Sequence, residues 1–311
     1  MIKQSRRESF AFLACGMASL AFGASTSHQP LMAREPIART GQARFRPSLA
    51  AYSFREYFSY MRGKPQKPKS DGKAIDMFGF IDYCVSLGCD AAELTSYFFQ
   101  PDADDGYLRE LRQHAFLNGV SISGTAIGND FSVDDPKALQ SQIEQTIAWI
   151  EKAGILGAPH IRIFAGTAKQ LGESKEKLNA ICTAVSQCAA VAKQQGVFLG
   201  IENHGGISSG QLLEVMSKVD SDWVGINLDT GNFVSDDPYE DIELCAPYAV
   251  NIQFKPSLRT TAGKLYDADF ARIATILRGS NYRGFVALEY EEANPYQNIP
   301  EVYAKMIAAL G

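Results

Sequence analysis

The sequence has little histidine, no excess of positive charge and no paired-cysteine motif. Only four histidines occur in 311 residues, and the formal net charge is −5. An acidic chain with scattered lysines and arginines is not expected to bind nucleic acid. Its six cysteines form no Cys-x-x-Cys pair, which excludes the redox and structural-zinc sites built on that motif.

The chain also lacks an apolar run of the ~20 residues that a transmembrane helix needs. A shorter apolar stretch occupies residues 10–24, directly after the basic pair Arg6 and Arg7. A basic start followed by a short apolar run is typical of an export signal, and the arginine pair favours the twin-arginine route. We therefore predict an export signal over residues 1–24, a polar linker over 25–46 and an exported, periplasmic domain over 47–311 without a membrane span.

Beyond the linker, short β-rich runs alternate with longer helical patterns, which is typical of βαβ units and a parallel sheet. Strands are predicted at residues 48–54, 91–94, 120–126, 160–164, 197–202, 224–229, 249–254 and 284–289. Helices are predicted at about 74–87, 104–118, 136–154, 174–195, 209–218, 238–244, 267–277 and 300–310. Eight repeats favour a single-domain α/β fold, the (β/α)8 or TIM barrel. The competing open doubly wound sheet usually has a glycine-rich turn after its first strand, and here that turn is absent.

Carboxylates end three of the predicted strands, at the edge where a barrel of this kind carries its active site. Glu202, Asp229 and Glu289 each follow an apolar run. Without a counter-ion, three converging carboxylates would raise one another's pKa. A divalent cation removes that repulsion, and oxygen ligands suit Mg²⁺ or Mn²⁺. The alternative is a set of separate salt bridges to Arg162 and Lys255.

The chain resembles the xylose isomerase-like TIM-barrel superfamily, in its sugar phosphate isomerase/epimerase branch. The resemblance covers about residues 47–311, and it is carried by the order and spacing of the segments at 51–55, 92–94, 200–204, 228–232, 251–255 and 287–290. It implies one divalent metal, Mn²⁺ or Mg²⁺ with Zn²⁺ or Co²⁺ as alternatives, held by Glu202, Asp229, Gln253 and Glu289. Gln253 stands where the family more often has histidine, and its neutral amide oxygen favours harder ions. Some similar dehydratases, including 3-dehydroshikimate dehydratases, also have glutamine there.

Other polar residues near the strand ends are candidates for catalysis and substrate binding. Glu202 or Glu289 could act as the base, and Lys255 could stabilise an enolate or move a proton. Substrate binding is predicted for His204, Arg162, Asn232, Glu93 and His160. Each of these also has a structural alternative, from an ion pair for Arg162 to a satisfied core imidazole for His160.

These residues predict a metal-dependent sugar isomerase or epimerase that acts through a metal-stabilised enediolate on a free sugar, keto-sugar or polyol. The same first proton abstraction permits a dehydratase or lyase acting on a keto-sugar or a 3-dehydroshikimate-like substrate. A non-catalytic sugar-binding barrel is a further alternative. DNA repair of the endonuclease IV type is opposed by the few histidines and the acidic charge. The expected partner is a small carbohydrate-like molecule, and homo-oligomerisation stays open.

Overall fold

Eight parallel strands close into a barrel, with neighbours in the order β1-β12-β9-β8-β7-β6-β5-β4. The structure is a computed structural model that describes residues 34–311, so the predicted export signal and the first part of the predicted linker lie outside the described residues. The barrel strands are β1 (Arg44–Ala50), β4 (Ala91–Thr95), β5 (Ser121–Ala126), β6 (His160–Ile163), β7 (Phe198–Glu202), β8 (Val224–Asp229), β9 (Ala249–Phe254) and β12 (Arg283–Leu288). The predicted TIM barrel is confirmed.

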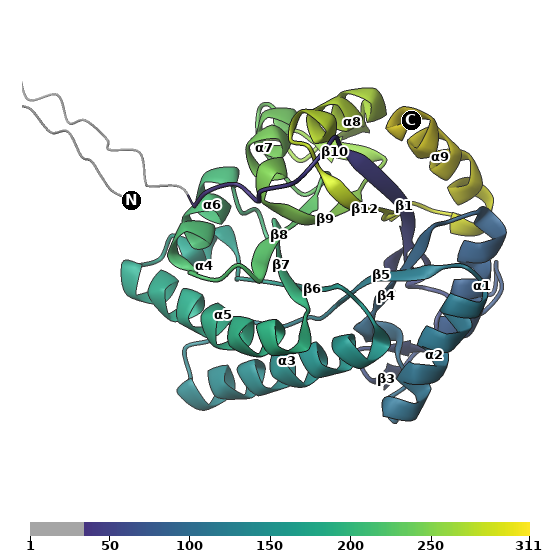
Figure 1. Cartoon of the computed structure of the whole chain (residues 1–311), viewed down its shortest axis with the longest axis horizontal. Coiled ribbons are helices and arrows are strands. Elements are labelled where there is room, and N and C mark those ends of the chain that lie inside the picture. Colours follow the sequence, from purple (N-terminus) through teal and green to yellow (C-terminus); the bar gives the residue numbers. More distant parts are fainter. Residues whose placement is uncertain (1–33) are drawn as a thin grey trace, which may run out of the picture. The chain divides into compact units, whose positions relative to one another are not determined.

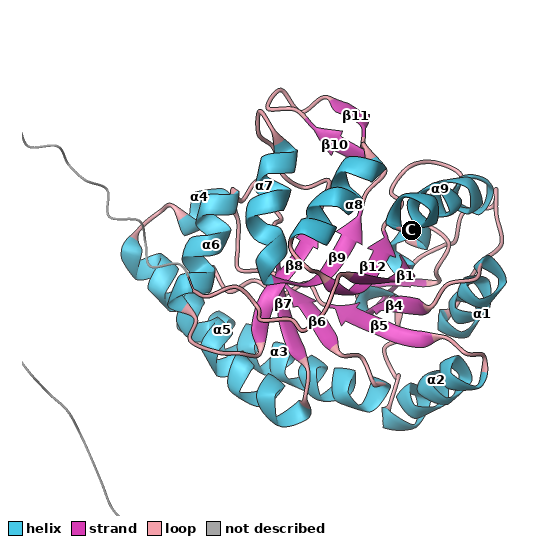
Figure 2. Ribbon diagram, turned by 45° about the horizontal axis from the view of Figure 1, so that its top comes forward, coloured by secondary structure: helices cyan, strands magenta, loops and turns pink. Residues whose placement is uncertain are grey.

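Helices cover the outside of the barrel, and the tilted view shows the strands enclosed by them (Figure 1 and Figure 2). They are α1 (Met77–Leu87), α2 (Asp105–Leu117), α3 (Pro136–Leu156), the short α4 (Ala168–Leu171), α5 (Lys175–Gln195), α6 (Ser209–Lys218), α7 (Pro238–Cys245), α8 (Phe270–Gly279) and α9 (Pro295–Leu310). Within residues 34–311, none of these helices has the length and hydrophobicity of a membrane span. Two hairpins and three 3₁₀ turns complete the fold: β2 (Tyr60–Met61) with β3 (Lys64–Pro65), β10 (Ser257–Arg259) with β11 (Leu265–Asp267), η1 (Ala51–Phe54), η2 (Ser96–Phe98) and η3 (Ala246–Tyr248).

Local sequence signals explain where the helices begin and end, as α3 illustrates. The Asp135 side chain accepts a hydrogen bond from the backbone N–H of Lys137, and Pro136 occupies the first helical position. Both features satisfy or remove backbone donors that have no partner at a helix start. At the other end, Gly157 adopts the left-handed conformation, with φ 78°, which ends the helix.

Several boundaries differ from the sequence-based prediction. The strand predicted to run to Phe54 ends at Ala50, and residues Ala51–Phe54 form η1 instead. Helix α8 begins at Phe270, three residues after the predicted 267. Strand β1 begins at Arg44, four residues before the predicted Ser48, because Arg44 already pairs with Arg283 on β12. Helix α9 begins at Pro295 and contains Pro300, where we predicted its start. A proline near the N-terminal end removes one intrahelical hydrogen bond without ending the helix, so the sequence signal marked the wrong proline.

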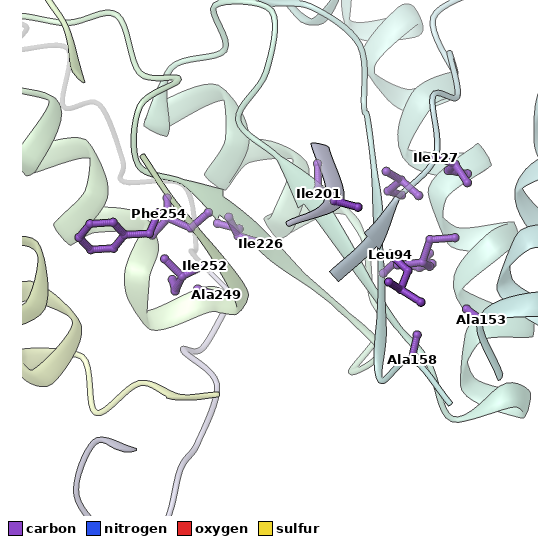
Figure 3. Close-up of a cluster of buried hydrophobic side chains, with 14 of the residues drawn as sticks. Leu94, Ile127, Ala153, Ala158, Ile201, Ile226, Ala249, Ile252 and Phe254 are labelled. Carbon is purple, nitrogen blue, oxygen red and sulfur yellow. The ribbon is translucent and has the colours of Figure 1, made fainter. Parts of the chain in front are cut away.

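The barrel strands separate apolar and polar side chains onto two faces. Residues such as Ile201, Ile226 and Ile252 belong to a buried hydrophobic cluster that also includes Ala153 of α3 (Figure 3). Alternate positions on the same strands carry polar side chains, because successive side chains of a strand point to opposite faces. The barrel interior is therefore polar while its outer face packs against the helices.

A glycine on β5 makes room for one of these interior side chains. The ring of His160, on neighbouring β6, lies where a Cβ atom at Gly124 would stand. The Nδ1 atom of His160 donates to the Ser123 carbonyl at 2.9 Å, which fixes the ring in that space. Gly124 is therefore required by close packing rather than by its backbone angles.

Replacing Gly124 with alanine is expected to lower the free energy of unfolding by about 1–3 kcal/mol, because the new methyl group overlaps the His160 ring. Gly279→Ala is the matched control, since no atom lies within 4 Å of its added Cβ and the residue lies within α8. Urea denaturation of the two variants measures the difference. Equal midpoints for Gly124→Ala and wild type would contradict this packing.

Candidate functional site

A cavity of about 120 Å³ lies where the barrel strands end. It is lined by Tyr52, Arg62, Tyr97, Arg162, Phe164, Glu202, His204, Asp229, Asn232, Lys255, Glu289 and Glu291. Seven predicted site residues are among them: Arg162, Glu202, His204, Asp229, Asn232, Lys255 and Glu289. The other three, Glu93, His160 and Gln253, are buried in the barrel and do not line the cavity.

Three carboxylates of this cavity are almost excluded from water. Glu202 is 4% exposed, Asp229 1% and Glu289 7%. Burial is the main cause that raises the pKa of Glu202 to about 7, of Asp229 to about 7 and of Glu289 to about 8, and repulsion among the carboxylates adds to it. The neighbouring cations therefore do not compensate fully for the loss of water around these carboxylates.

Lys255 supplies one of the two cations closest to these carboxylates. Its Nζ lies 3.4 Å from Asp229 Oδ2, 3.5 Å from Glu289 Oε1 and 2.6 Å from Glu291 Oε2. Burial acts to lower the pKa of Lys255, but the three carboxylates outweigh it and hold that pKa above its ordinary value. Glu291 is 41% exposed, so its pairing draws the ammonium toward the rim of the cavity.

Arg162 supplies the other cation. Its Nε lies 2.7 Å from Glu202 Oε2, although the N–H is not aimed for a hydrogen bond, so the contact is an ion pair. Its terminal nitrogen donates to the Ile127 carbonyl at 2.7 Å, which anchors the guanidinium. On the other side, the Asn232 amide donates to Glu202 Oε1 at 2.9 Å. Both oxygens of Glu202 are thus held in place.

Gln253 belongs to a buried hydrogen-bond network inside the barrel. Its amide nitrogen donates to Glu93 Oε1 at 2.9 Å, and its oxygen accepts from Asn227 at 2.7 Å. The second oxygen of Glu93 accepts from Asn251, also at 2.9 Å. Strands β4 and β9 are not neighbours, so this network crosses the barrel interior. An ionised carboxylate can only accept hydrogen bonds, so Glu93 fixes which way the Gln253 amide points.

The two candidate histidines have different environments. His160 is buried, burial lowers its pKa to about 4, and its Nε2 has no hydrogen-bond partner at 3.9 Å from Glu93. Ser123 therefore holds a buried, neutral imidazole through Nδ1, but Nε2 is left without a partner among the described residues, so the ring is not the fully satisfied core imidazole of the structural alternative. His204 instead lines the cavity, with its ring 4.6 Å from that of Phe164. Burial and the charge of Arg162 lower its pKa.

Arg62, Phe164 and Glu291 also line the cavity and were not predicted from the sequence. The sequence did contain a signal for Glu291, because this second acidic residue lies two positions after Glu289 at the same strand end. Arg62 carried none, since the β2–β3 hairpin that places it falls between the first predicted strand and the first predicted helix.

The predicted metal ligands fit a divalent cation in their chemistry and charge. Glu202, Asp229 and Glu289 offer buried carboxylates in excess of the neighbouring cations. Gln253 has a neutral oxygen, which accepts a hydrogen bond from Asn227 in this structure and would have to turn toward the cavity to bind a metal. In the part of the chain that the structure describes, no three His, Cys, Asp or Glu side chains are placed to hold a metal together. Lys255 lies close to two of the carboxylates instead, so the predicted ligand set stays a prediction.

The fold and the cavity define a TIM barrel with a charged site at the C-terminal ends of its strands, the position used by enzymes of this fold. The chain belongs to the xylose isomerase-like TIM barrel family, whose model matches residues 81–310. No curated protein matches the sequence.

Solved structures with the same fold include several sugar-acting enzymes. A D-psicose 3-epimerase from Clostridium cellulolyticum H10 has a TM-score of 0.63 at 17% identity, covering 85% of this chain and 96% of that one. The 3-keto-D-glucoside 4-epimerase from E. coli has a TM-score of 0.60 at 15% identity, covering 85% and 100%. A probable 3-DHS dehydratase from Bacillus anthracis has a TM-score of 0.60 at 15% identity, covering 85% and 98%. At these identities the similarity shows a shared fold.

The depressed pKa of His160 predicts a pH-dependent contribution to stability. As the pH falls below 6.5, the unfolded chain protonates this histidine while the folded protein does not, until the pH reaches about 4. Between pH 7 and pH 4 the advantage of wild type over His160→Gln should therefore shrink by about 3 kcal/mol. Urea denaturation of both proteins at intermediate pH values measures it. A difference that stays constant with pH would show that His160 is not buried in its neutral form.

Proposed function

We propose that this protein is a divalent-metal-dependent isomerase or epimerase that moves a proton on the carbon next to the carbonyl of a sugar. The observation that carries the proposal is the placement of Glu202 and Glu289 in one small cavity beside the cations Arg162 and Lys255. Proton abstraction from such a carbon needs a carboxylate base and positive charge beside the oxygen that becomes anionic. The relatives that act on ketoses agree with this reaction class.

The topology places the two glutamates on different sides of the cavity. Glu202 ends β7 and Glu289 follows β12, and β8 and β9 lie between these strands in the barrel. A substrate between them would present one face to each carboxylate. One glutamate could then remove a proton from one face while the other returns a proton to the opposite face, which inverts the carbon.

The remaining charged groups bind and orient the substrate. Arg162 is anchored by Ile127 and can donate to a substrate oxygen from its fixed position. Lys255 can follow the developing negative charge, because its ammonium is shared among three carboxylates. A divalent metal held by Glu202, Asp229, Gln253 and Glu289 would supply Lewis-acid polarisation of the substrate carbonyl. Lys255 would then have to leave Asp229 and Glu289 and keep only its ion pair with Glu291.

A dehydratase or lyase is the second candidate function. Gln253, rather than histidine, occupies the predicted neutral ligand position, and a probable 3-DHS dehydratase shares the fold. Elimination begins with the same proton abstraction and differs in its second step, where a leaving group departs. Lys255, with its three donor hydrogens beside Glu289, could protonate that group.

We further propose that the protein acts after export to the periplasm. The proposal rests on the basic start and the short apolar run over residues 10–24. An exported enzyme would meet unphosphorylated sugars, which favours a free sugar, a keto-sugar or a polyol as the reacting unit.

Glu289→Gln is expected to reduce proton exchange between D₂O and a ketose by about 10²–10⁴-fold, because an amide cannot accept the proton. The exchange is measured by NMR with Mg²⁺ or Mn²⁺ present. Glu292→Gln is the matched control, since Glu292 is exposed and does not line the cavity. Exchange within a few-fold of wild type in Glu289→Gln would remove this residue from the reaction.

A further inference from the structure

A second cavity, of about 330 Å³, adjoins the site cavity and shares Arg62 and Tyr97 with it as lining residues. The site cavity, at about 120 Å³, is smaller than the ~300–1,000 Å³ typical of small-molecule sites. It can therefore enclose the reacting end of a ligand, while the rest must extend beyond it. The second cavity lies within that typical range and offers the adjoining space.

The lining of the second cavity suits a ring that bears hydroxyl groups. The half-buried indole of Trp149 provides a flat apolar face. Around it stand the amides of Gln100 and Gln145 and the hydroxyl of Ser96. The Nζ of Lys152 lies over the Trp149 ring, 5.0 Å from its centroid, on a flexible side chain that a ring stacked on that face would displace. A sugar ring combines apolar C–H faces with hydroxyl edges, so an aromatic face surrounded by hydrogen-bonding groups can contact both.

Arg62 lies at the junction of the two cavities, in an unusual backbone conformation. Its guanidinium stacks over the Tyr97 ring at 4.4 Å, and its backbone N–H donates to the Tyr97 carbonyl at 2.7 Å. Arg62 and Gly63 form the two-residue turn of the β2–β3 hairpin, with φ values of 51° and 74°. Turns of this kind favour asparagine, aspartate or glycine at the first position, so an arginine there is strained. The strained turn places the Arg62 guanidinium where the two cavities meet.

We propose that the second cavity is a subsite for a second sugar ring, so that the substrate is a glycoside of disaccharide size. Its reacting sugar enters the cavity with Glu202 and Glu289, its second ring stacks on Trp149, and Arg62 contacts the linkage between them. The assignment of the reacting half rests on the proposed function. The second subsite rests on the cavity, the indole and the strained turn.

Tryptophan fluorescence tests this directly, because the chain has two tryptophans. Trp223 packs on Phe198, with ring centroids 4.8 Å apart, and lines neither cavity. In a Trp223→Phe background, Trp149 is the remaining fluorophore. The protein is titrated, with Mg²⁺ present, with D-fructose and with the ketose disaccharides lactulose, isomaltulose and leucrose. At least one disaccharide should change Trp149 emission and bind roughly tenfold more tightly than D-fructose.

Two variants separate binding from folding, with calorimetry as the binding measurement. Trp149→Ala and Arg62→Asn should each lose about fivefold or more in disaccharide affinity, and less in affinity for D-fructose. Arg62→Asn should also keep or raise the Tm, because asparagine tolerates the positive φ better than arginine. If Arg62 had a purely structural role, its replacement by asparagine would lower both the disaccharide affinity and the Tm. Lys64→Asn, which removes a charge two residues away and outside both cavities, should change neither quantity.

Three results would overturn the second subsite: no saturable binding of any of the three disaccharides, equal affinities for these and D-fructose, or unchanged Trp149 emission at saturation. Proton exchange with D₂O tests the proposed reaction separately. A disaccharide that binds at Trp149 without any C–H exchange would contradict the proposed reaction and leave the subsite standing.

Discussion

The site depends on negative charge buried in excess of the positive charge beside it. Glu93, Glu202, Asp229 and Glu289 are nearly excluded from water, and the burial of unpaired carboxylates is costly. Arg162 and Lys255 offset part of that cost. The pKa values of Glu202 and Glu289, raised to about 7 and about 8, reflect the part that is not offset. A divalent cation would relieve it, so the proposed metal and the proposed acid–base chemistry rest on the same electrostatic constraint that holds Lys255 beside Asp229 and Glu289.

The barrel supplies the stability that allows this arrangement. Its outer face packs as an apolar layer against the helices, while its interior contains buried polar side chains. The Glu93–Gln253 hydrogen bond crosses that interior and holds the amide from below the cavity. The apolar layer thus supports the fold, and the interior network orients the groups at the strand ends.

Local pattern was sufficient to predict the strands, most helices and the three carboxylates at the strand ends. It could not predict depth. Glu93, His160 and Gln253 were predicted as site residues, yet the structure buries them in the barrel, away from the cavity lining. The hydrogen bond that holds Glu93 and Gln253 there joins strands that are not neighbours, and such a contact leaves no signal in the local sequence. Arg62 was missed for a related reason. A two-residue turn with an arginine at its first position lacks the asparagine, aspartate or glycine that normally marks that position.

Anomalous diffraction from crystals grown with Mn²⁺ tests the central claim most directly. The account predicts one strong peak in contact with oxygens of Glu202, Asp229, Gln253 and Glu289, with the Lys255 ammonium kept on Glu291 and moved away from Asp229 and Glu289. Density without a peak at that position, and with Lys255 still between Asp229 and Glu289, would contradict it.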